Sequence, residues 1–456
     1  MASNGDCPID LLLAYYGDDF TGSTDALEQL VRGGVPKMLF IEPPTADSLA
    51  RFPGLRAVGV ASQARAMSAA TMDAALPPAF AALADLQPRF VHYKVCSTFD
   101  SSPDTGSIGR AIDLGAQQFA NRVTPLVVGA PSLGRYCVFG NLFARSGLDS
   151  PPFRLDRHPT MRRHPVTPMN EADLRLHLSR QTHRPVALID VLAVERGLDA
   201  AEAQLALTSP GDIVLLDALS DSHLATIGRL LAQLQVREQK SQFVVGSSAI
   251  EAALTRHWQS TGAAGDDLAS RPAAPVDRIV VVSGSCSPVT ERQIAHAVAR
   301  GFAEVAIDVM SLAEPSDAAA EVTSLVQRVR NHCHQGQSVI VHTLGGDRRP
   351  LASTDAGSRR ALGATLGAAL GQILRESIAS HAIRRAVIAG GDTAGDVARA
   401  LEIESLELAA PLEPGAPLCR VRSRFAPADG IELSFKGGQI GRDDFFVAAL
   451  HGSGDV

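Results

Sequence analysis

Short apolar runs alternate with longer amphipathic stretches along the first half of the chain. Stretches such as Met72–Leu86 and His223–Gln235 have the spacing of amphipathic helices. This alternation is typical of βαβ units, so it predicts an α/β fold with mainly parallel sheets. The predicted strands of this half are Leu11–Tyr15, Lys37–Ile41, Ala57–Val60, Phe90–Val95, Leu126–Gly129, Val186–Asp190, Ile213–Asp217 and Phe243–Gly246.

The segment Gln259–Asp277 interrupts this pattern. It is rich in Gly, Ala, Ser and Pro and has no apolar periodicity, which is typical of a linker. We therefore predict an N-terminal domain at 1–260, a linker at 261–275 and a C-terminal domain at 276–456. Two α/β domains with a ligand cleft between them predict an enzyme that closes on two ligands. The predicted strands of the second domain are Ile279–Val282, Phe302–Asp308, Ser338–His342, Arg385–Ala389, Leu418–Val421 and Ile431–Phe435.

The first apolar run leads into the polar stretch Tyr15–Glu28, which reads YYGDDFTGSTDALE. This pattern predicts a strand that ends in a loop and a helix that begins there, which is where open parallel sheets bind ligands. Asp18 and Asp19 then lie at the carboxyl edge of the strand and Thr21 adds a hydroxyl, an arrangement that suits a polyhydroxylated acid. The alternative is structural: one aspartate caps the helix and the other is solvated.

Three polar, glycine-containing loops follow predicted strands of the second domain. They are Ser283–Thr290, Gly390–Asp396 and Lys436–Gly441. Hydroxyls and glycines at the start of a helix favour an anion, because N–H groups and the positive end of the helix dipole meet there. Asp392 suits a magnesium ion or a ribose hydroxyl, and Lys436 suits phosphate oxygens. The alternatives are an ordinary capped helix start for the first loop and a hairpin turn for the last.

Composition narrows the class of protein. The chain has 456 residues, of which 45% are hydrophobic and 20% charged, and its net charge of −7 argues against a nucleic-acid-binding surface. The N-terminus lacks the basic region of a signal peptide and its first apolar run is too short to span a bilayer, so we expect a cytoplasmic protein without membrane segments. The six cysteines form no C-x-x-C pair, which favours reduced thiols over a structural metal site. No P-loop and no dinucleotide-type G-x-G-x-x-G motif occurs, so the classical nucleotide folds are excluded at the motif level.

Five separated segments occur in the order GDDFTGSTDALE, SGSCSPVTERQ, AGGDTAGDVARAL, EPGAP and SFKGGQIG. Together they resemble the four-carbon acid sugar kinase family, whose members phosphorylate tetronates or 3-oxo-tetronates with ATP. The resemblance implies that the N-terminal domain binds the acid sugar and that the C-terminal domain binds ATP with Mg²⁺. By motif, the implied sugar-site residues are Asp18, Asp19, Thr21, Lys94, Ser97 and Thr98. The implied nucleotide-site residues are Ser283, Gly284, Ser285, Gly390, Gly391, Asp392, Thr393, Gly415, Lys436, Gly437 and Gly438.

One segment departs from the family pattern. After the strand that ends at Val95, many relatives carry an acid and an arginine where this chain has Cys96 and Asp100. An aspartate cannot replace an arginine that clamps a carboxylate, so another cation must hold the carboxylate of the substrate. The candidates are Lys94, Arg110, Arg135 and the arginines of 154–165.

The stretch 154–165 holds four arginines and two histidines between prolines and is predicted to be a loop. It is either a lid that presents cations to an anionic substrate or a solvated basic loop. His158 and His164 lack carboxylate or thiolate partners at ligand spacing, so we predict no metal site there.

Phosphoryl transfer needs aligned reactants, neutralised charge and removal of one proton. Asp19 is the first choice for the base, with Asp18 beside it, because two adjacent carboxylates raise the pKa of one of them. The substrate is expected to be a tetronate or 3-oxo-tetronate; the alternatives are a branched oxo-acid such as 3-oxo-isoapionate, or a binding protein without turnover. A homodimer is the prior expectation for an enzyme of this size.

Overall fold

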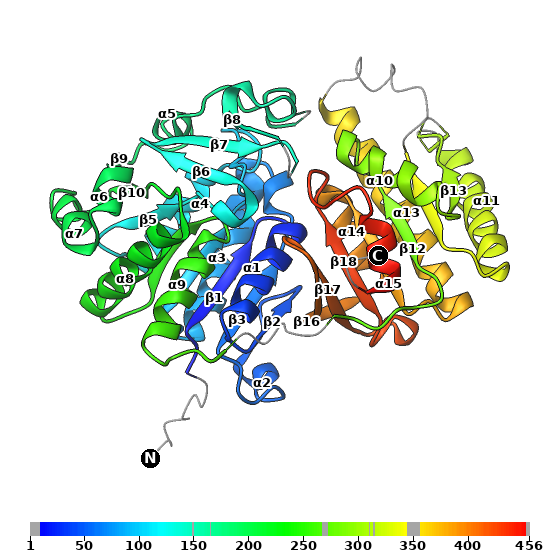
Figure 1. The fold of residues 1–456 in the computed structure, drawn as a ribbon, viewed down its shortest axis with the longest axis horizontal. Helices are drawn as coiled ribbons and strands as arrows, with labels where there is room; N and C mark the ends of the chain where they lie inside the picture. The colour runs from blue at the N-terminus through cyan, green and yellow to red at the C-terminus, as the bar shows by residue number, and fades with distance from the viewer. Residues whose placement is uncertain are drawn as a thin grey trace. The chain divides into compact units, whose positions relative to one another are not determined.

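The structure is a computed structural model that describes residues 10–147, 150–164, 166–266, 272–309, 311–312, 315–343 and 356–452. The chain divides into two compact units, Met1–Leu268 and Ala269–Val456. Each unit is a sheet covered by helices (Figure 1), so the predicted α/β fold class with mainly parallel sheets is confirmed. The predicted domain limits at 260 and 276 stay predictions.

The sheet of the first unit is parallel throughout. Because β3 and β4 flank β1 while β2 lies outside β3, the strand order reverses at β1, which is where doubly wound sheets bind ligands. The strands in spatial order are β2 (Lys37–Phe40), β3 (Ala57–Ala61), β1 (Leu13–Gly17), β4 (Phe90–Lys94), β11 (Gln242–Gly246), β5 (Thr124–Val127), β10 (Ile213–Leu216) and β9 (Val186–Ile189).

Helices cover both faces of this sheet (Figure 1). On one face α1 (Phe20–Arg32) packs against α9 (Ala249–Ser260), which also contacts α8 (Asp221–Glu238). On the other face α3 (Ala69–Asp85) packs against α4 (Ile108–Phe119). The shorter helices of the unit are α2 (Ala46–Leu49), α5 (Leu174–Leu178), α6 (Val191–Glu195) and α7 (Leu198–Ala206).

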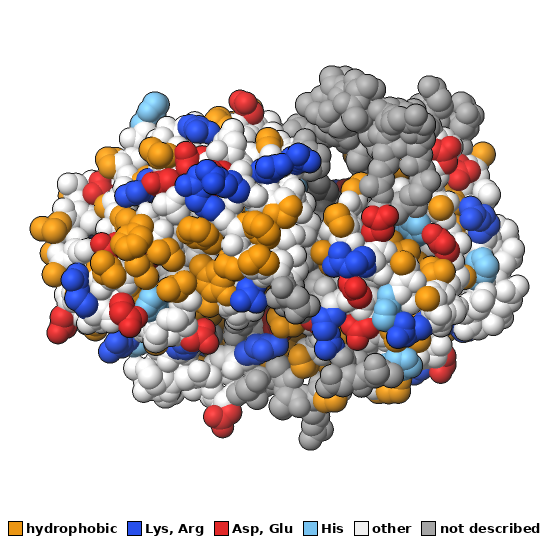
Figure 2. All heavy atoms as spheres, turned by 45° about the horizontal axis from the view of Figure 1, so that its top comes forward, with side chains coloured by type: hydrophobic (Ala, Val, Ile, Leu, Met, Phe, Trp, Pro, Cys, Tyr) orange, Lys and Arg blue, Asp and Glu red, His pale blue; other side chains and the backbone are white. Residues whose placement is uncertain are grey.

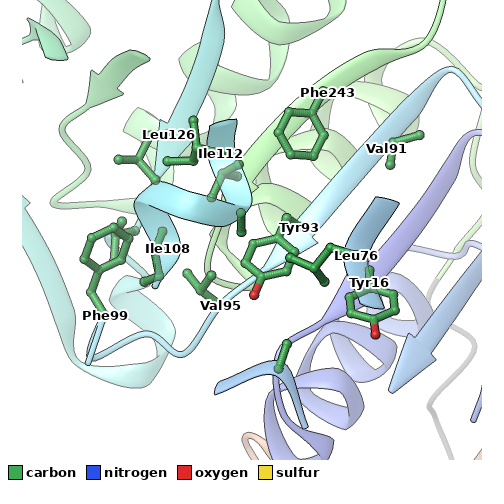
Figure 3. Packing of buried hydrophobic residues seen from close by; sticks show 14 of the residues in the cluster. Tyr16, Leu76, Val91, Tyr93, Val95, Phe99, Ile108, Ile112, Leu126 and Phe243 are labelled. Carbon is green, nitrogen blue, oxygen red and sulfur yellow. The ribbon is translucent and has the colours of Figure 1, made fainter. Parts of the chain in front are cut away.

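Alternation along β4 divides its side chains between the two faces. Val91 and Tyr93 join a buried hydrophobic cluster (Figure 3). The ring of Phe80 of α3 belongs to the same cluster and meets that of Tyr93 edge to face at 6.0 Å between centroids. His92 lies on the opposite face, where its Nδ1 is 2.6 Å from Glu251 Oε1 of α9. Lys94 shares the side of His92, because successive side chains of a strand point to opposite faces.

A small antiparallel sheet of the first unit was missed at the sequence level. It consists of β6 (Arg135–Val138), β7 (Asn141–Arg145) and β8 (Pro152–Arg154). Its strands are short and rich in arginine and polar residues, so they lack the apolar run by which the other strands are found. Two 3₁₀ turns, η3 (Leu155–Arg157) and η4 (Met161–Arg163), follow β8, so the predicted loop at 154–165 is largely turn structure.

The second unit has a mixed sheet. Strands β13 (Ala303–Ala306), β14 (Val339–His342), β12 (Val280–Ser283), β15 (Arg385–Ala389) and β18 (Glu432–Lys436) are parallel in this order. Two antiparallel strands complete it, β17 (Ala416–Ser423) and β16 (Ile403–Glu413). The helices of this unit are α10 (Pro288–Val298), α11 (Pro315–His334), α13 (Ala356–His381), α14 (Gly391–Ala400) and α15 (Phe445–His451).

The predicted strands are found with limits shifted by up to two residues, and β15 matches the prediction Arg385–Ala389. The strand β16 was not predicted. Its burial alternates irregularly because the ladder with β17 contains register shifts, so its sequence has no clean period of two.

Charged side chains of both signs are interspersed on the face shown in Figure 2. None of the helices among the described residues is both long and apolar enough to cross a membrane.

Candidate functional sites

The carboxyl ends of β3, β1 and β4 bring three polar loops together in the first unit. The backbone amide of Asp18 donates to the carbonyl of Lys94 at 2.8 Å, and the amide of Arg65 donates to the carbonyl of Asp18 at 2.9 Å. These bonds fasten the loop after β1 to the loops after its two neighbours. Residues 18–19, 62–65 and 94–100 therefore form one site, which we call the acid site.

Asp19 is the N-cap of α1. Its Oδ1 accepts a hydrogen bond from the amide of Gly22 at 2.6 Å, and its Oδ2 is 2.9 Å from Arg65 Nη1. Both carboxylate oxygens are thus engaged within the protein. The structural alternative holds in part, because one aspartate does cap the helix; the other, Asp18, is 3% exposed and so is not solvated.

Asp18 is buried without a hydrogen-bond partner for its Oδ1 among the described residues. Burial and the neighbouring charge of Asp19 raise its pKa to about 8, although Arg65 and Lys94 act in the opposite direction. A carboxyl group with a pKa near neutrality and a vacant oxygen is suited to proton transfer.

Lys94 ends β4 and is 1% exposed. Its Nζ donates to the carbonyl of Val95 at 3.0 Å. Burial opposes its charge, but the carboxylates of Asp25, Asp19 and Asp18 outweigh burial and raise its pKa. Lys94 is therefore a buried ammonium among aspartates.

Gly22 lets the first turn of α1 approach this lysine. A Cβ on Gly22 would lie 2.6 Å from Lys94 Nζ and 2.5 Å from Asp19 Oδ1. Thr21 lies next to it, 8% exposed, and its hydroxyl has no hydrogen-bond partner in the described part of the chain.

Arg65 is a member of the site that the sequence prediction missed. It lies in the 3₁₀ turn η1 (Ala64–Ala66), just after β3. The sequence pattern that pointed to Asp18, a polar residue shortly after a buried strand, also applies to Arg65 and could have found it.

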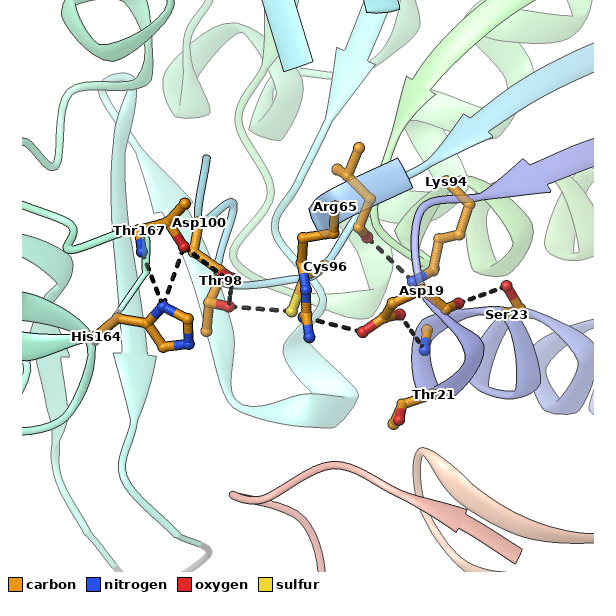
Figure 4. Close-up of polar contacts among 12 residues, drawn as sticks. Asp19, Thr21, Ser23, Arg65, Lys94, Cys96, Thr98, Asp100, His164 and Thr167 are labelled. Atoms are coloured by element: carbon orange, nitrogen blue, oxygen red, sulfur yellow. Dashed lines mark hydrogen bonds and ion pairs between the residues drawn. The ribbon is translucent and has the colours of Figure 1, made fainter. Parts of the chain in front are cut away.

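A row of hydrogen bonds extends from Cys96 away from Asp19 (Figure 4). The sulfur of Cys96 is 3.0 Å from Thr98 Oγ1, which donates to Asp100 Oδ1 at 2.6 Å. The hydroxyl of Thr167 donates to Asp100 Oδ2 at 3.3 Å. Burial acts to raise the pKa of Asp100, but Arg65 and the bond from Thr98 lower it. Ser97 is half-buried between Cys96 and Thr98.

Arg135 begins β6 and is 8% exposed. It makes no ion pair with any described residue; Nη1 bonds to the carbonyl of Leu133, and Nε has no partner there. Burial lowers its pKa, while Cys96 and Asp25 act to raise it. An arginine buried without a counter-ion is costly unless an anion binds beside it.

The other cations considered for the carboxylate lie elsewhere. Arg110 of α4 is paired with Asp73 at 2.5 Å, and its side chain is 40% exposed. The four arginines of the stretch 154–165 are exposed: Arg154, Arg157, Arg162 and Arg163. His158, by contrast, is buried and accepts from the amides of Thr160 and Met161, each at 3.2 Å, so it holds the turns together.

In the second unit, the carboxyl ends of β12, β15 and β18 meet at one edge, which we call the nucleotide site. The amide of Gly284 donates to the carbonyl of Ala389 at 3.1 Å, and the amide of Gly390 donates to that of Lys436 at 2.9 Å. Thr290, at the start of α10, donates its hydroxyl to the carbonyl of Gly438 at 3.2 Å. The three predicted glycine loops are thus joined to one another.

Glycines allow close approach at this edge. A Cβ on Gly284 would lie 2.3 Å from Thr393 Oγ1, and one on Gly438 would lie 2.9 Å from Ser285 Oγ. Gly390 has a φ of +128°, and it begins α14 without a side-chain cap. Ser285 N is 3.4 Å from Ser283 Oγ, which keeps that loop folded back on β12.

Lys436 ends β18 and is fully buried. Its Nζ donates to the hydroxyl of Thr290 at 3.2 Å and to the carbonyl of Gly437 at 2.9 Å. Burial lowers its pKa to about 7. No carboxylate of the described residues forms an ion pair with it, so it resembles Arg135 in lacking a counter-ion.

The remaining predicted nucleotide residues are Gly391, Gly415 and Asp392. Gly391 is the first residue of α14. Gly415, with a φ of +80°, turns β16 into β17, whose start lies at the carboxyl end of β18 because Leu418 pairs antiparallel with Ser434. The side chain of Asp392 lies outside the described residues.

The chain matches a family model described as a sugar-binding N-terminal domain over residues 13–254 and one described as a nucleotide-binding C-terminal domain over residues 280–446. The chain belongs to the four-carbon acid sugar kinase family. Within this family it is 47% identical over 455 residues to a 3-oxo-isoapionate kinase of Paraburkholderia graminis, covering 98% of this chain and 95% of the relative. It is 31% identical over 445 residues to a 3-oxo-tetronate kinase of Pseudomonas savastanoi, covering 96% of each.

Two crystal structures resemble this family member over nearly its whole length. A Salmonella typhimurium LT2 protein, provisionally described as a tRNA synthase, has a TM-score of 0.69 and 25% identity, covering 96% of this chain and 98% of its own. A Haemophilus influenzae protein has a TM-score of 0.64 with the same coverage and 21% identity, which supports the shared fold alone.

Proposed function

We propose that this protein is an ATP-dependent kinase that phosphorylates a hydroxyl of a small sugar acid. The observation that carries the proposal is a buried cation without a described counter-ion in each unit, Arg135 in the first and Lys436 in the second. A sugar acid brings a carboxylate, and a nucleotide brings phosphates. Each cation thus matches one of the two anions that a kinase of this family must bind.

In the acid site, Arg135 holds the carboxylate and Lys94 supports its charge. Asp18 takes the proton from the acceptor hydroxyl as that oxygen attacks the γ-phosphoryl group, and ADP leaves. The sequence favoured Asp19 for this role. We assign it instead to Asp18, because both oxygens of Asp19 are engaged by Gly22 and Arg65 whereas Asp18 Oδ1 is unpartnered.

The nucleotide site suits phosphates through backbone and lysine. The glycine loops allow phosphate oxygens to come close to N–H groups at the uncapped start of α14, and Lys436 supplies positive charge. Among the described residues, no three His, Cys, Asp or Glu side chains gather as a metal site, so we assign no metal ligand there. Mg²⁺ bound with the nucleotide would supply neutralisation of the phosphate charge.

Of the candidate acids, the branched oxo-acid 3-oxo-isoapionate ranks first. The relative named for that substrate is 47% identical, whereas the 3-oxo-tetronate kinase is 31% identical. The departure at Asp100 is consistent with a substrate that differs from the linear tetronates.

A coupled ADP-release assay tests the proposal. Mg·ATP is supplied with linear tetronates, 3-oxo-tetronates and branched oxo-acids, and the phosphorylated product is identified by mass spectrometry. Turnover of one acid that Asp18→Asn loses supports the kinase and the site. Binding of both ligands without any transfer would instead identify a binding protein.

Two further expectations, a homodimer and a cytoplasmic location, stay predictions. Light scattering on the purified protein measures the first, and fractionation of the source cells measures the second.

A further inference from the structure

Asp100 connects the loop after β4 to the segment after η4. Its two carboxylate oxygens accept from hydroxyls on different segments, Thr98 at 2.6 Å and Thr167 at 3.3 Å, and Asp100 itself is 3% exposed. This carboxylate therefore fixes Thr167, and through it His164, against the acid site. Figure 4 shows the resulting row of contacts from His164 to Cys96, with the contacts of Arg65, Asp19 and Ser23 as a separate set on the other side of Cys96.

The donors of this row are determined by counting protons. A threonine hydroxyl has one hydrogen, and that of Thr98 is committed to Asp100. The contact of 3.0 Å between Cys96 and Thr98 must then be an S–H donor to oxygen. The thiol is accordingly protonated, in agreement with a pKa that burial and the charge of Asp100 raise to about 11.

The same count determines the tautomer of His164. Its Nδ1 accepts from the backbone amide of Thr167 at 3.1 Å, so Nδ1 carries no hydrogen; the hydroxyl of Thr167, 3.0 Å from the same nitrogen, shares its one hydrogen between Nδ1 and Asp100. The ring nitrogen that carries a hydrogen is then Nε2, which lies across the ring from Thr167. Nε2 has no hydrogen-bond partner in the described part of the chain, and His164 is only half-buried.

We infer that His164 is a specificity-determining residue whose Nε2–H donates to an oxygen on a branch of the substrate, and that Asp100 is the positioning residue that holds it. This inference rests on the proposed function. An unbranched four-carbon acid has its two ends, carboxylate and terminal hydroxyl, engaged by Arg135 and Asp18. In Figure 4, His164 lies on the far side of Cys96 and Thr98 from Asp19, so it addresses an additional substituent such as a hydroxymethyl group.

Variants at position 164 separate a donor from a structural side chain. His164→Leu removes the Nε2 donor, whereas His164→Gln places an amide N–H near the same point. His158→Gln is the matched control, because His158 lies in the same segment but spends its Nδ1 on local amides. The readout is the ratio of kcat/KM for a branched 3-oxo acid to that for linear 3-oxo-tetronate.

His164→Leu should lower this ratio about 10- to 100-fold, since the hydrogen bond serves only the branched acid. His164→Gln should recover most of it and His158→Gln should leave it unchanged. Asp100→Asn should lower the ratio by a smaller factor, because it loosens Thr167 without removing the donor. Equal losses on both acids, or no loss, would overturn the inference and leave His164 a structural residue.

A binding measurement keeps the two proposals apart. Calorimetry with the branched acid and no nucleotide does not depend on turnover. If the wild type transfers no phosphate but binds the branched acid at least tenfold more tightly than His164→Leu does, the kinase proposal fails and the inference stands. If the wild type fails to bind the branched acid, or binds it as His164→Leu does, the inference fails.

Discussion

The two candidate sites are built by different means. In the acid site the start of α1 is already occupied, because the carboxylate of Asp19 caps it, and charge is supplied by side chains on several loops. In the nucleotide site α14 begins at Gly390 without a side-chain cap, and backbone groups line the edge with one lysine among them. The acid site is built of side chains and the nucleotide site largely of backbone.

This difference in construction affects how easily each site accepts substitutions. A site made of side chains can change its ligand through single substitutions, and Cys96 and Asp100 are the two positions of the acid site at which this chain departs from the family pattern described above. A site made of close backbone turns tolerates few changes, because a Cβ at Gly284 or Gly438 would collide with Thr393 or Ser285. Substitutions are therefore expected to be tolerated more easily in the acid site than in the nucleotide site.

The largest expected effect is at Asp18. Asp18→Asn should lower kcat about 1,000-fold, since an amide cannot accept the proton. With a pKa of about 8 in the free enzyme, Asp18 must lose its proton before it can act, so wild-type kcat/KM for the acid should rise with pH until about pH 8. Steady-state kinetics between about pH 6 and about pH 9 measure both the loss of kcat and the rise of kcat/KM.

Asp19→Asn is the matched variant. It removes the ion pair with Arg65 but leaves Asp18, so it should lower kcat less and keep a rise with pH, displaced to lower pH because the charge of Asp19 no longer raises the pKa of Asp18. If Asp19→Asn abolishes the rise and Asp18→Asn retains it, the base is Asp19, as the sequence favoured.

Removal of the buried cation of the acid site comes next. Arg135→Gln should raise KM for the acid about 100-fold with little change in KM for ATP, because a charge-assisted bond to the carboxylate is lost. Arg110→Gln, at an exposed ion pair with Asp73, should change neither value. Similar losses in both variants would remove Arg135 from the carboxylate site.

Substitution of Lys436 should have a somewhat smaller effect than substitution of Arg135, because backbone N–H groups also bind the phosphates in the proposed nucleotide site. Lys436→Met should weaken ATP binding about 30-fold, and Lys240→Met, at a lysine whose side chain is 44% exposed, should not. The pKa of Lys436 is about 7, so at about pH 8 its side chain is neutral in most molecules. A bound phosphate would raise that pKa, because it favours the charged ammonium. Calorimetry in buffers of different ionisation enthalpy should then show proton uptake on ATP binding at about pH 8, absent in Lys436→Met. Equal uptake in both proteins would exclude Lys436 as a phosphate ligand.

A steric substitution tests the backbone character of the same site. Gly284→Ala should weaken ATP binding about tenfold, because its Cβ would lie 2.3 Å from Thr393 Oγ1. Gly363→Ala in α13 meets nothing within 4 Å and should be neutral or slightly stabilising. Unchanged affinity in Gly284→Ala, by calorimetry, would mean that phosphate does not approach this loop.

The smallest effect concerns stability. The unfolded chain loses the proton of Asp18 near its ordinary pKa of 3.8, whereas the folded chain keeps it to about 8. Folding is therefore favoured less as pH rises through this window, and Asp18→Asn escapes the loss because an amide does not ionise. The melting temperature of Asp18→Asn minus that of the wild type should therefore grow by roughly 2–5 °C from the acidic to the alkaline end of this pH window. A difference independent of pH would show that burial does not raise this pKa.

Local order along the chain was enough to predict the fold class and the polar loops that meet at the edge of each sheet. Apolar runs alternating with amphipathic stretches predicted a mainly parallel sheet, and parallel strands place their following loops at one edge, so the loop of Asp18 and the glycine loops were expected there; Lys94 was expected from the resemblance. The strands β6 to β8 were not predicted, because pairing with one another stabilises them rather than an apolar pattern of their own.

Burial and non-local contact decided the rest. The sequence presents Asp18 and Asp19 as equivalent neighbours, but the fold gives one of them an amide and an arginine and leaves the other desolvated with a vacant oxygen. Arg65, Asp100 and His164 are far apart in the chain, and only the tertiary structure brings them to one row. The sequence by itself determined which chemical groups follow which strands; the tertiary structure determined their partners and protonation, because both depend on distance and dielectric environment rather than on order along the chain.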